Sequence, residues 1–173
     1  MQSTISLLLA FVACASAAVS DSSAGGFTVK LTSDIHASPD EVYTKLVRNL
    51  GDWWDPAHTF SRDPHNLTIE ERAGGCFCEK IRSGGGVRHM EVVYFVPGKT
   101  LVMIGALGPL QSLAATGSMT IALSPVAGGT KLDLTYAVSG YLAAGMNTWA
   151  QPVDGMLAGQ LARLKNFAEH GKP

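Results

Sequence analysis

The chain has 173 residues, of which 46% are hydrophobic and 16% charged, and its formal net charge at pH 7 is -1. That length suits one domain with a sizeable hydrophobic core. The 13 Lys and Arg residues are spread along the chain without a basic run, so the charge pattern argues against binding to nucleic acid.

The N-terminal segment predicts export. Residues 5–18 are apolar apart from two serines, and Ala15-Ser16-Ala17 matches the small-residue site that signal peptidase cleaves. The run is too short to span a bilayer, which needs roughly 20 apolar residues. No Lys or Arg precedes it, and the alternatives are a disordered tail or lipidation at Cys14. We expect cleavage after Ala17 and a periplasmic or secreted protein without stable insertion in a membrane.

The expected division of the chain is a signal peptide over residues 1–17, a small polar linker over 18–26 and one folded domain over 27–170. Cleavage after residue 17 would leave two cysteines, Cys76 and Cys78. An oxidising compartment permits a disulfide, but residues two apart on one strand lie near or beyond the Cα separation that a bridge allows. We therefore expect free thiols.

The domain begins with a strand followed by a helix. Residues 27–36 alternate between apolar and polar side chains, as in a strand. Ser38-Pro39-Asp40-Glu41 combines an N-cap, a proline at the first helical position and a capping box. The helix is expected to run to about Leu50 and to end at Gly51. An aromatic-rich loop or short broken helix over residues 52–66 follows.

Six further strands and a long helix complete the pattern. The strands are expected over residues 67–73, 76–82, 87–96, 100–107, 117–126 and 130–140. The helix is expected from Trp149 to about His170. Its inner stripe consists of Val153, Leu157, Leu161, Leu164 and Ala168. An antiparallel sheet with one apolar face must be covered, and this helix is the only element long enough to cover it.

This order of elements resembles the START-like, Bet v 1-like (SRPBCC) superfamily over roughly residues 27–169. The motifs that carry the resemblance are Trp53-Trp54-Asp55-Pro56-Ala57-His58-Thr59-Phe60-Ser61, Gly74-Gly75-Cys76-Phe77-Cys78-Glu79, Gly105-Ala106-Leu107-Gly108-Pro109-Leu110 and Pro152-Val153-Asp154-Gly155-Met156-Leu157. They are similar to a bacterial branch labelled activator-of-Hsp90-ATPase-like or polyketide-cyclase-like.

The resemblance implies an α+β helix-grip fold, in which a curved antiparallel sheet of about seven strands wraps around the C-terminal helix and leaves a cavity between them. The superfamily includes lipid carriers, hormone receptors, cyclases and co-chaperone domains, so the fold alone does not fix the function. The predicted leader departs from the cytosolic members that bind Hsp90.

The candidate ligand-binding residues are those expected between sheet and helix. They are Met103, Leu107, Met119, Tyr136 and Val138 on strands, and Val153, Met156 and Leu157 on the helix. Two groups would close the ends of the space: Trp53, Trp54 and His58 at one, and Tyr141, Met146 and Trp149 at the other. Met and aromatic side chains suit a tolerant apolar pocket. A filled core is the alternative that this pattern does not separate from a cavity.

A metal site is not expected. Pairing the hairpin through residues 83–86 sets Cys78 opposite Glu91 and Lys80 opposite His89, so that Cys76, Cys78, His89 and Glu91 share one face. These are metal-ligand types, but no zinc spacing is present and Lys80 would place a positive charge among them. We expect neither a metal nor a cofactor.

Acid–base chemistry has five candidates, which are His58, Glu79, His89, Tyr141 and Asp154. No nucleophile elbow, phosphate loop or dinucleotide fingerprint accompanies them. His58 and Asp154 are the weak catalytic candidates. We expect His58 to be a structural hydrogen-bonding residue, and Asp154, in the first turn of the last helix, to interact favourably with the helix dipole.

The function expected from these features is binding of a small apolar molecule by an exported protein, with the ligand and the oligomeric state left open. Two alternatives remain: a cofactor-free cyclase or dehydratase acting on an aromatic or polyketide-like substrate, and a protein-interaction module.

Overall fold

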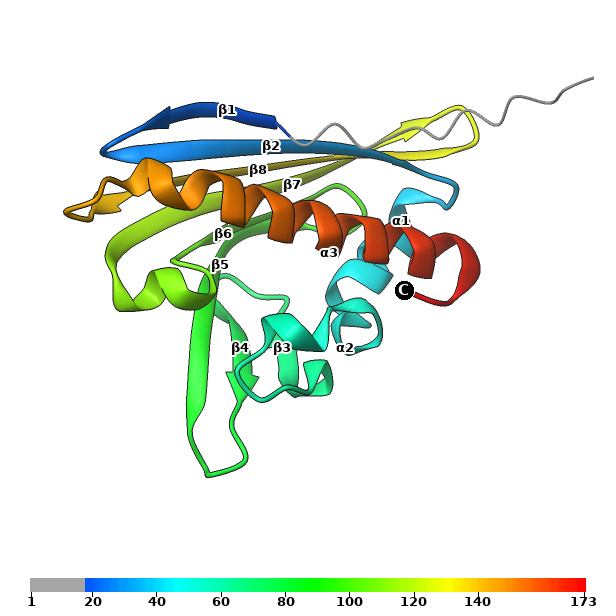
Figure 1. Ribbon diagram of the computed structural model, residues 1–173. Helices are drawn as coiled ribbons and strands as arrows, with labels where there is room; N and C mark the ends of the chain where they lie inside the picture. Colours follow the sequence, from blue (N-terminus) through cyan, green and yellow to red (C-terminus); the bar gives the residue numbers. More distant parts are fainter. Residues whose placement is uncertain (1–17) are drawn as a thin grey trace, which may run out of the picture.

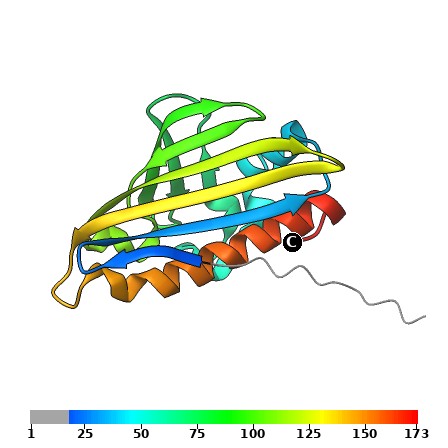
Figure 2. The same ribbon diagram turned by 90° about the horizontal axis from the view of Figure 1, so that it is seen from above.

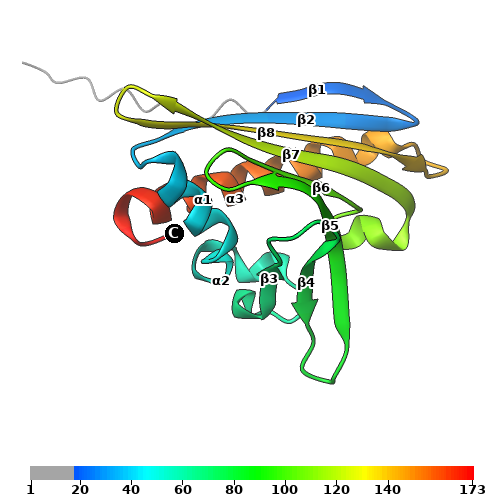
Figure 3. The same ribbon diagram turned by 180° about the vertical axis from the view of Figure 1, so that it is seen from behind.

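The computed structural model describes residues 18–173, which form one antiparallel sheet and a long C-terminal helix, α3, that crosses its inner face (Figure 1). The sheet has eight strands in the order β1-β2-β8-β7-β6-β5-β4-β3. Seen from behind, the sheet turns downward at β5, β4 and β3, away from β1 and β2 (Figure 3). This is the helix-grip fold, as expected.

The strand count exceeds the expected seven because the polar segment before the domain is itself a strand. β1 (Ala18–Ser23) pairs with β2 (Gly26–Ile35), from Ala18 opposite Lys30 to Ser23 opposite Gly26. Small and polar residues are accepted at the edge of a sheet, where one face and one side stay in water. The expected linker over residues 18–26 is therefore a hairpin, while the predicted signal peptide over 1–17 lies outside the described residues.

The first helix begins as its sequence predicts and ends earlier. α1 (Pro39–Val47) has Ser38 as its N-cap, and the Ser38 and Glu41 side chains form both bonds of the capping box. The chain then makes a separate short turn, α2 (Leu50–Trp53). Gly51 lies inside this turn. A Cβ at this position would approach within 2.9 Å of the His65 Cα atom, so the close packing requires glycine. The glycine allows close packing and does not end α1.

Two 3-10 turns, η1 (Pro56–His58) and η2 (Pro64–Asn66), lead into the remaining strands. These strands are β3 (Leu67–Ile69), β4 (Gly75–Lys80), β5 (Gly86–Val96), β6 (Thr100–Ile104), β7 (Ala114–Val126) and β8 (Gly129–Tyr141). β6 is shorter than predicted because Gly105, with φ of 146°, turns the chain toward η3 (Gly108–Ser112). At this φ a side chain would be strained.

α3 (Ala150–His170) follows a short turn, η4 (Met146–Trp149), and ends at Gly171 in the left-handed conformation. The predicted inner stripe of α3 is buried along its whole length. Figure 2 shows the helix running along the sheet beside β1 and β2. In the part of the chain that the structure describes, no helix is long and apolar enough to cross a membrane.

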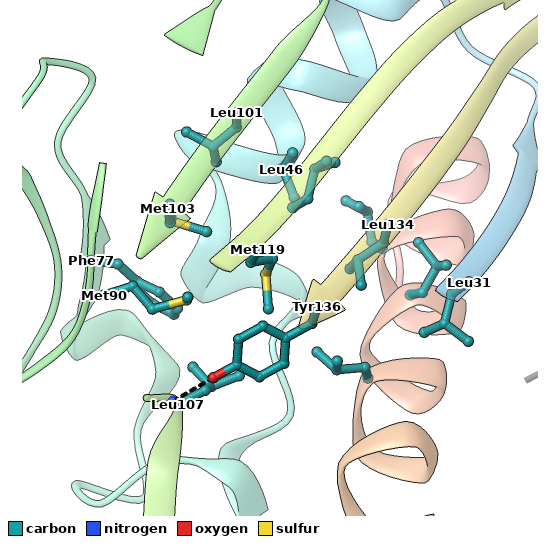
Figure 4. Close-up of a cluster of buried hydrophobic side chains, with 14 of the residues drawn as sticks. Leu31, Leu46, Phe77, Met90, Leu101, Met103, Leu107, Met119, Leu134 and Tyr136 are labelled. Carbon is teal, nitrogen blue, oxygen red and sulfur yellow. Dashed lines mark hydrogen bonds between the residues drawn. The ribbon is translucent and has the colours of Figure 1, made fainter. Parts of the chain in front are cut away.

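The core lies between this helix and the sheet. Figure 4 shows part of it, with Leu31, Leu134 and Tyr136 from neighbouring strands pointing to one side. Tyr136 has no exposed surface, and its hydroxyl accepts a hydrogen bond from the Leu107 N–H at 3.0 Å and donates to the Gly105 carbonyl at 3.2 Å. Burial raises the pKa of Tyr136 to about 12, so the hydroxyl keeps its proton and fixes the turn after β6.

Candidate functional site

An open cavity of about 330 Å³ lies at the β3–β5 end of the fold. Four segments form its walls: residues 54 and 57–60 of the aromatic loop, Leu67, Phe77 and His89 on β3 to β5, residues 107–110, and Trp149, Pro152, Val153 and Met156 around the start of α3. Most of these side chains are apolar or aromatic. A volume of this size is at the lower end of the range for small-molecule pockets, about 300–1,000 Å³.

A second, smaller space of about 40 Å³ lies deeper between the sheet and α3. Trp54, Phe77 and Leu107 line both spaces, so these three side chains separate the outer cavity from the inner one. The inner space is walled almost entirely by apolar side chains and is about the size of a single water molecule. Of these two spaces, the outer cavity is the one with room for an organic ligand.

The candidate ligand-binding residues divide into three groups. The outer cavity is lined by Trp54, His58, Leu107, Trp149, Val153 and Met156. The inner space is lined by Trp53, Met103, Met119 and Leu157, together with Trp54 and Leu107. Neither space is lined by Tyr136, Val138, Tyr141 or Met146. The structure thus brings together the candidates from the aromatic loop, Trp149 and the start of α3, and leaves out those of β8 and Met146.

The four residues left out have different surroundings. Tyr136 and Val138 are core residues of β8, and Met146 is fully buried in η4. Tyr141 is 75% exposed at the end of β8. Alternation along β8 correctly predicts which side chains face inward, but it does not reveal how far along the strand the hollow part of the interior extends.

His58 does not have the role expected for its side chain. The ring is exposed at the cavity wall. The hydrogen bond at this position comes from the backbone, because the His58 carbonyl accepts the indole N–H of Trp54 at 3.1 Å. The loop therefore holds Trp54 through its main chain, and any residue at position 58 supplies the same acceptor.

Asp154 does not have the position at the helix start that was expected for it. The first turn of α3 contains no acidic residue, so a favourable interaction with the helix start does not account for this carboxyl group. Asp154 is buried, one of its carboxyl oxygens has no hydrogen-bond partner, and it does not line the cavity. Burial raises its pKa. Asp154 is therefore not placed to contact a ligand held in the cavity.

His89 gives the cavity its buried polar group, and the sequence offered it as an acid–base candidate but not among the ligand-binding residues. His89 lies at a β-bulge, where the β4–β5 pairing shifts between Phe77 opposite Met90 and Cys78 opposite Arg88. The extra residue turns its side chain inward, so that His89 and Met90 are both buried although they are consecutive. The expected register had no bulge and placed His89 opposite Lys80, which is wrong because Lys80 lies opposite Gly86.

The two cysteines that the same register placed beside His89 lie elsewhere. Cys76 and Cys78 form a disulfide with a Cα separation of 5.3 Å, which is within the usual range for a bridge. The expectation of free thiols is wrong, because the two Cα atoms lie closer together than the roughly 6.6 Å of a fully extended strand. Among the described residues no group of three His, Cys, Asp or Glu could hold a metal ion.

His89 is held by a buried carboxylate. Its Nε2 atom lies 3.1 Å from Glu79 Oε2, and both side chains are almost fully buried. Glu79 also accepts the backbone N–H groups of Phe60 and Ser61. One carboxylate therefore joins β4, the bulge on β5 and the aromatic loop that walls the cavity.

The protonation states of this pair follow from its surroundings. Burial alone would raise the pKa of Glu79, but the donors from Ser61, Phe60 and His89 outweigh it and lower the pKa. Burial lowers the pKa of His89, and the Glu79 carboxylate offsets that effect only in part. Glu79 is thus ionised and His89 neutral at pH 7, with the His89 proton on Nε2, which faces the carboxylate.

Comparison with known proteins identifies the family to which this geometry belongs. A family model described as "Polyketide cyclase / dehydrase and lipid transport" matches residues 26–169, and it confirms the resemblance to the SRPBCC superfamily. No curated protein matches the chain.

Several solved structures share the fold. One is an uncharacterized protein from Rhizobium leguminosarum, which is 16% identical with a TM-score of 0.62 and matches over 82% of this chain and 93% of its own. The Aha1 dimer from Colwellia psychrerythraea is 20% identical with a TM-score of 0.61, over 84% and 98%. CalU16 from Micromonospora echinospora is 15% identical with a TM-score of 0.59, over 92% and 86%. Identities this low show a common fold and do not transfer an activity.

Proposed function

The chain belongs to the polyketide cyclase / dehydrase and lipid transport family, and from this premise we propose that it is an exported protein that binds and carries a small apolar molecule. The observation that carries the proposal is the outer cavity of about 330 Å³ between the aromatic loop, β4–β5 and the start of α3. An apolar molecule of that size would exchange its contact with water for contact with Trp, Phe, Leu and Met side chains, which is favourable.

Export is supported by two features. The apolar run that ends at Ala15-Ser16-Ala17 has the form of a signal peptide, and the disulfide between Cys76 and Cys78 suits an oxidising compartment. Cleavage after Ala17 would leave β1 (Ala18–Ser23) intact on the edge of the sheet. Mass spectrometry of the protein from its native host is expected to find a chain that starts near Ala18, and a full-length chain in the cytosol would contradict export.

The binding function is tested by filling the cavity. Met156 lines it from α3 and is partly buried, so the larger ring of Met156→Trp can enter open space. We expect this variant to weaken calorimetrically measured binding of a neutral apolar probe, 2-methoxynaphthalene, at least tenfold while the melting temperature changes little. Ala162→Trp is the matched control, because Ala162 is exposed on the same helix and does not line the cavity.

A filled interior would give the opposite result. Overpacking a close-packed core costs about 1–3 kcal/mol, so Met156→Trp would then lower the melting temperature. Destabilisation of this variant, together with the absence of probe binding to the parent protein, would contradict the proposed function.

The second candidate function, a cofactor-free cyclase or dehydratase, is favoured by one specific observation. The His89–Glu79 pair is a buried base with an orienting carboxylate in the wall of an apolar cavity, which is the arrangement of a general base. Turnover of an aromatic or polyketide-like substrate that is lost in His89→Phe would support this function over carriage. Stoichiometric binding without product would support the carrier.

A further inference from the structure

The cavity has one buried side chain that can hydrogen bond with a ligand, and that side chain is His89. The other polar side chains in the described part of its lining are His58, which is exposed, and Thr59 and Trp149, which are partly exposed. The indole N–H of Trp54 is already bonded to the His58 carbonyl. The Leu107 N–H, in the same wall, is already bonded to the Tyr136 hydroxyl. A ligand that enters the cavity therefore finds apolar surface on most sides and a single buried polar contact.

The surfaces around that contact are aromatic and flat. The Phe60 ring lies 6.0 Å from the His89 ring with 23° between their planes, and the Phe77 ring lies 5.1 Å from it. Phe77 in turn meets Trp54 edge to face at 5.9 Å. Aromatic side chains pack favourably against other rings in offset and edge-to-face arrangements. A planar molecule fits such a wall better than a flexible alkyl chain, which would lose more conformational freedom on binding.

The hydrogen bond that His89 can offer is set by Glu79. The carboxylate accepts from Nε2, so in the neutral ring the second nitrogen, Nδ1, is an acceptor. Its present partner is the Gln111 side-chain amide at a long distance of 3.3 Å, and the same Nε2 atom of Gln111 also donates to the Arg88 carbonyl at 3.1 Å. Because Gln111 is exposed, its amide can move to water when a better donor arrives.

The charge of the pair excludes one class of ligand. An ionised Glu79 beside a neutral His89 leaves a buried negative charge next to the cavity, and no Lys or Arg is among the lining residues that the structure describes. A carboxylate placed in the cavity would lose its hydration and meet a like charge, and both effects oppose binding. Fatty acids and aromatic acids are therefore poor ligands.

We propose that His89 is the polar anchor of the cavity, where its Nδ1 atom accepts a hydrogen bond from the hydroxyl of a small, neutral, planar aromatic ligand such as a naphthol. This assignment rests on the proposed binding function and gives it a ligand class. The hydroxyl replaces the Gln111 amide on Nδ1, while the ring of the ligand packs against Phe60 and Phe77.

Three probes with the same ring system test the assignment by calorimetric titration at pH 7.5. They are 2-naphthol, 2-methoxynaphthalene, which lacks the donor, and 2-naphthoate, which is an anion. An unpaired hydroxyl loses affinity when it is buried, so without an acceptor the methyl ether would bind at least as tightly as the naphthol. With His89 as acceptor, we expect the naphthol to bind about three- to tenfold more tightly, the range that one neutral hydrogen bond gives.

Two variants separate the anchor from the cavity. His89→Phe keeps a ring of similar shape and removes the acceptor, so the preference for the naphthol is expected to disappear while 2-methoxynaphthalene still binds. His170→Phe, at an exposed histidine in the last turn of α3, is the matched control. Gln111→Ala removes the competing donor without touching the buried pair, and we expect it to tighten binding of the naphthol alone.

The outcomes distinguish this inference from the function on which it rests. Equal binding of naphthol and methyl ether by the parent, a preference that persists in His89→Phe, tighter binding of naphthoate, or weaker naphthol binding in Gln111→Ala would each overturn the anchor and leave the binding cavity in place. Failure of all three probes to bind the parent would contradict the proposed function itself.

Discussion

The two ends of the sheet are built differently. On one side, β7 and β8 pair over 13 residues without a register shift, and β2 pairs with β8 in the same regular way. The edge strand β1 alone interrupts this regularity, with one shift between Val19 and Asp21. On the other side, β3 has only three residues, and the β4–β5 and β5–β6 pairings each contain a shift. The regular end packs against α3 and, of the two internal spaces, borders only the small inner one, whereas the irregular end borders the outer cavity.

This difference links the local irregularity to function. Uninterrupted alternation sends every second side chain into the core, and such a surface closes tightly against a helix. A bulge bends the strand and re-aims a side chain, which here turns His89 inward next to the inward-facing Glu79. Irregular pairing therefore supplies both the bend that leaves space and the polar group within it.

The largest effect that tests this comparison is on stability. Leu31 is 3% exposed on β2 and lines neither internal space, so Leu31→Ala is expected to lower the free energy of unfolding by about 2–5 kcal/mol through a new cavity. Met156→Ala, in the wall of the existing cavity, is expected to cost about 1 kcal/mol or less. Urea unfolding with unchanged m-values measures both. Equal costs would mean that the two ends are equally well packed.

The same division explains how much the sequence could predict. The capping box at Ser38, the alternation in β8 and the stripe on α3 each depend on neighbours a few residues away, and all three predictions are confirmed. The loop motif and the helix pattern make Trp54 and Met156 candidate ligand-binding residues, and both line the cavity.

The bulge at His89 was not predictable in this way. The hairpin turn over residues 83–86 suggests a regular register. The wrong register also produced the expected face that His89 shared with Cys76 and Cys78. A signal was available in Arg88 and His89, since two consecutive polar residues between Val87 and Met90 break strict alternation, but alternation alone does not say which residue is extra.

A smaller effect concerns pH and the irregular end alone. The unfolded chain takes up a proton at His89 near the usual pKa of 6.5, whereas burial lowers the pKa of the folded side chain. In the window below pH 6.5 the unfolded state thus binds more protons, and acidification lowers the free energy of unfolding. Glu79, whose folded pKa is lowered from 4.5, adds a second loss below that pH.

The measurement is the urea midpoint between pH 7.5 and pH 5. We expect the midpoint of the parent to fall over this range and that of His89→Phe to fall less, while His170→Phe follows the parent. If His89→Phe retains the full pH dependence of the parent, the histidine is not buried in the neutral form and the pair is differently charged.

The smallest expected effect separates the main chain from the side chain in the aromatic loop. The His58 ring is exposed, and only its carbonyl oxygen bonds to Trp54, so His58→Ala is expected to change the free energy of unfolding by less than about 0.5 kcal/mol. Trp54→Phe, which removes the indole donor and leaves that carbonyl without its partner, is expected to cost about 1–3 kcal/mol. Thermal and urea unfolding of the two variants compare them directly. A loss of 1 kcal/mol or more in His58→Ala would show that the ring packs or hydrogen bonds inside the protein. The irregular end would then be held by its side chains, and the substitution would be expected to disturb the cavity wall as well as the loop.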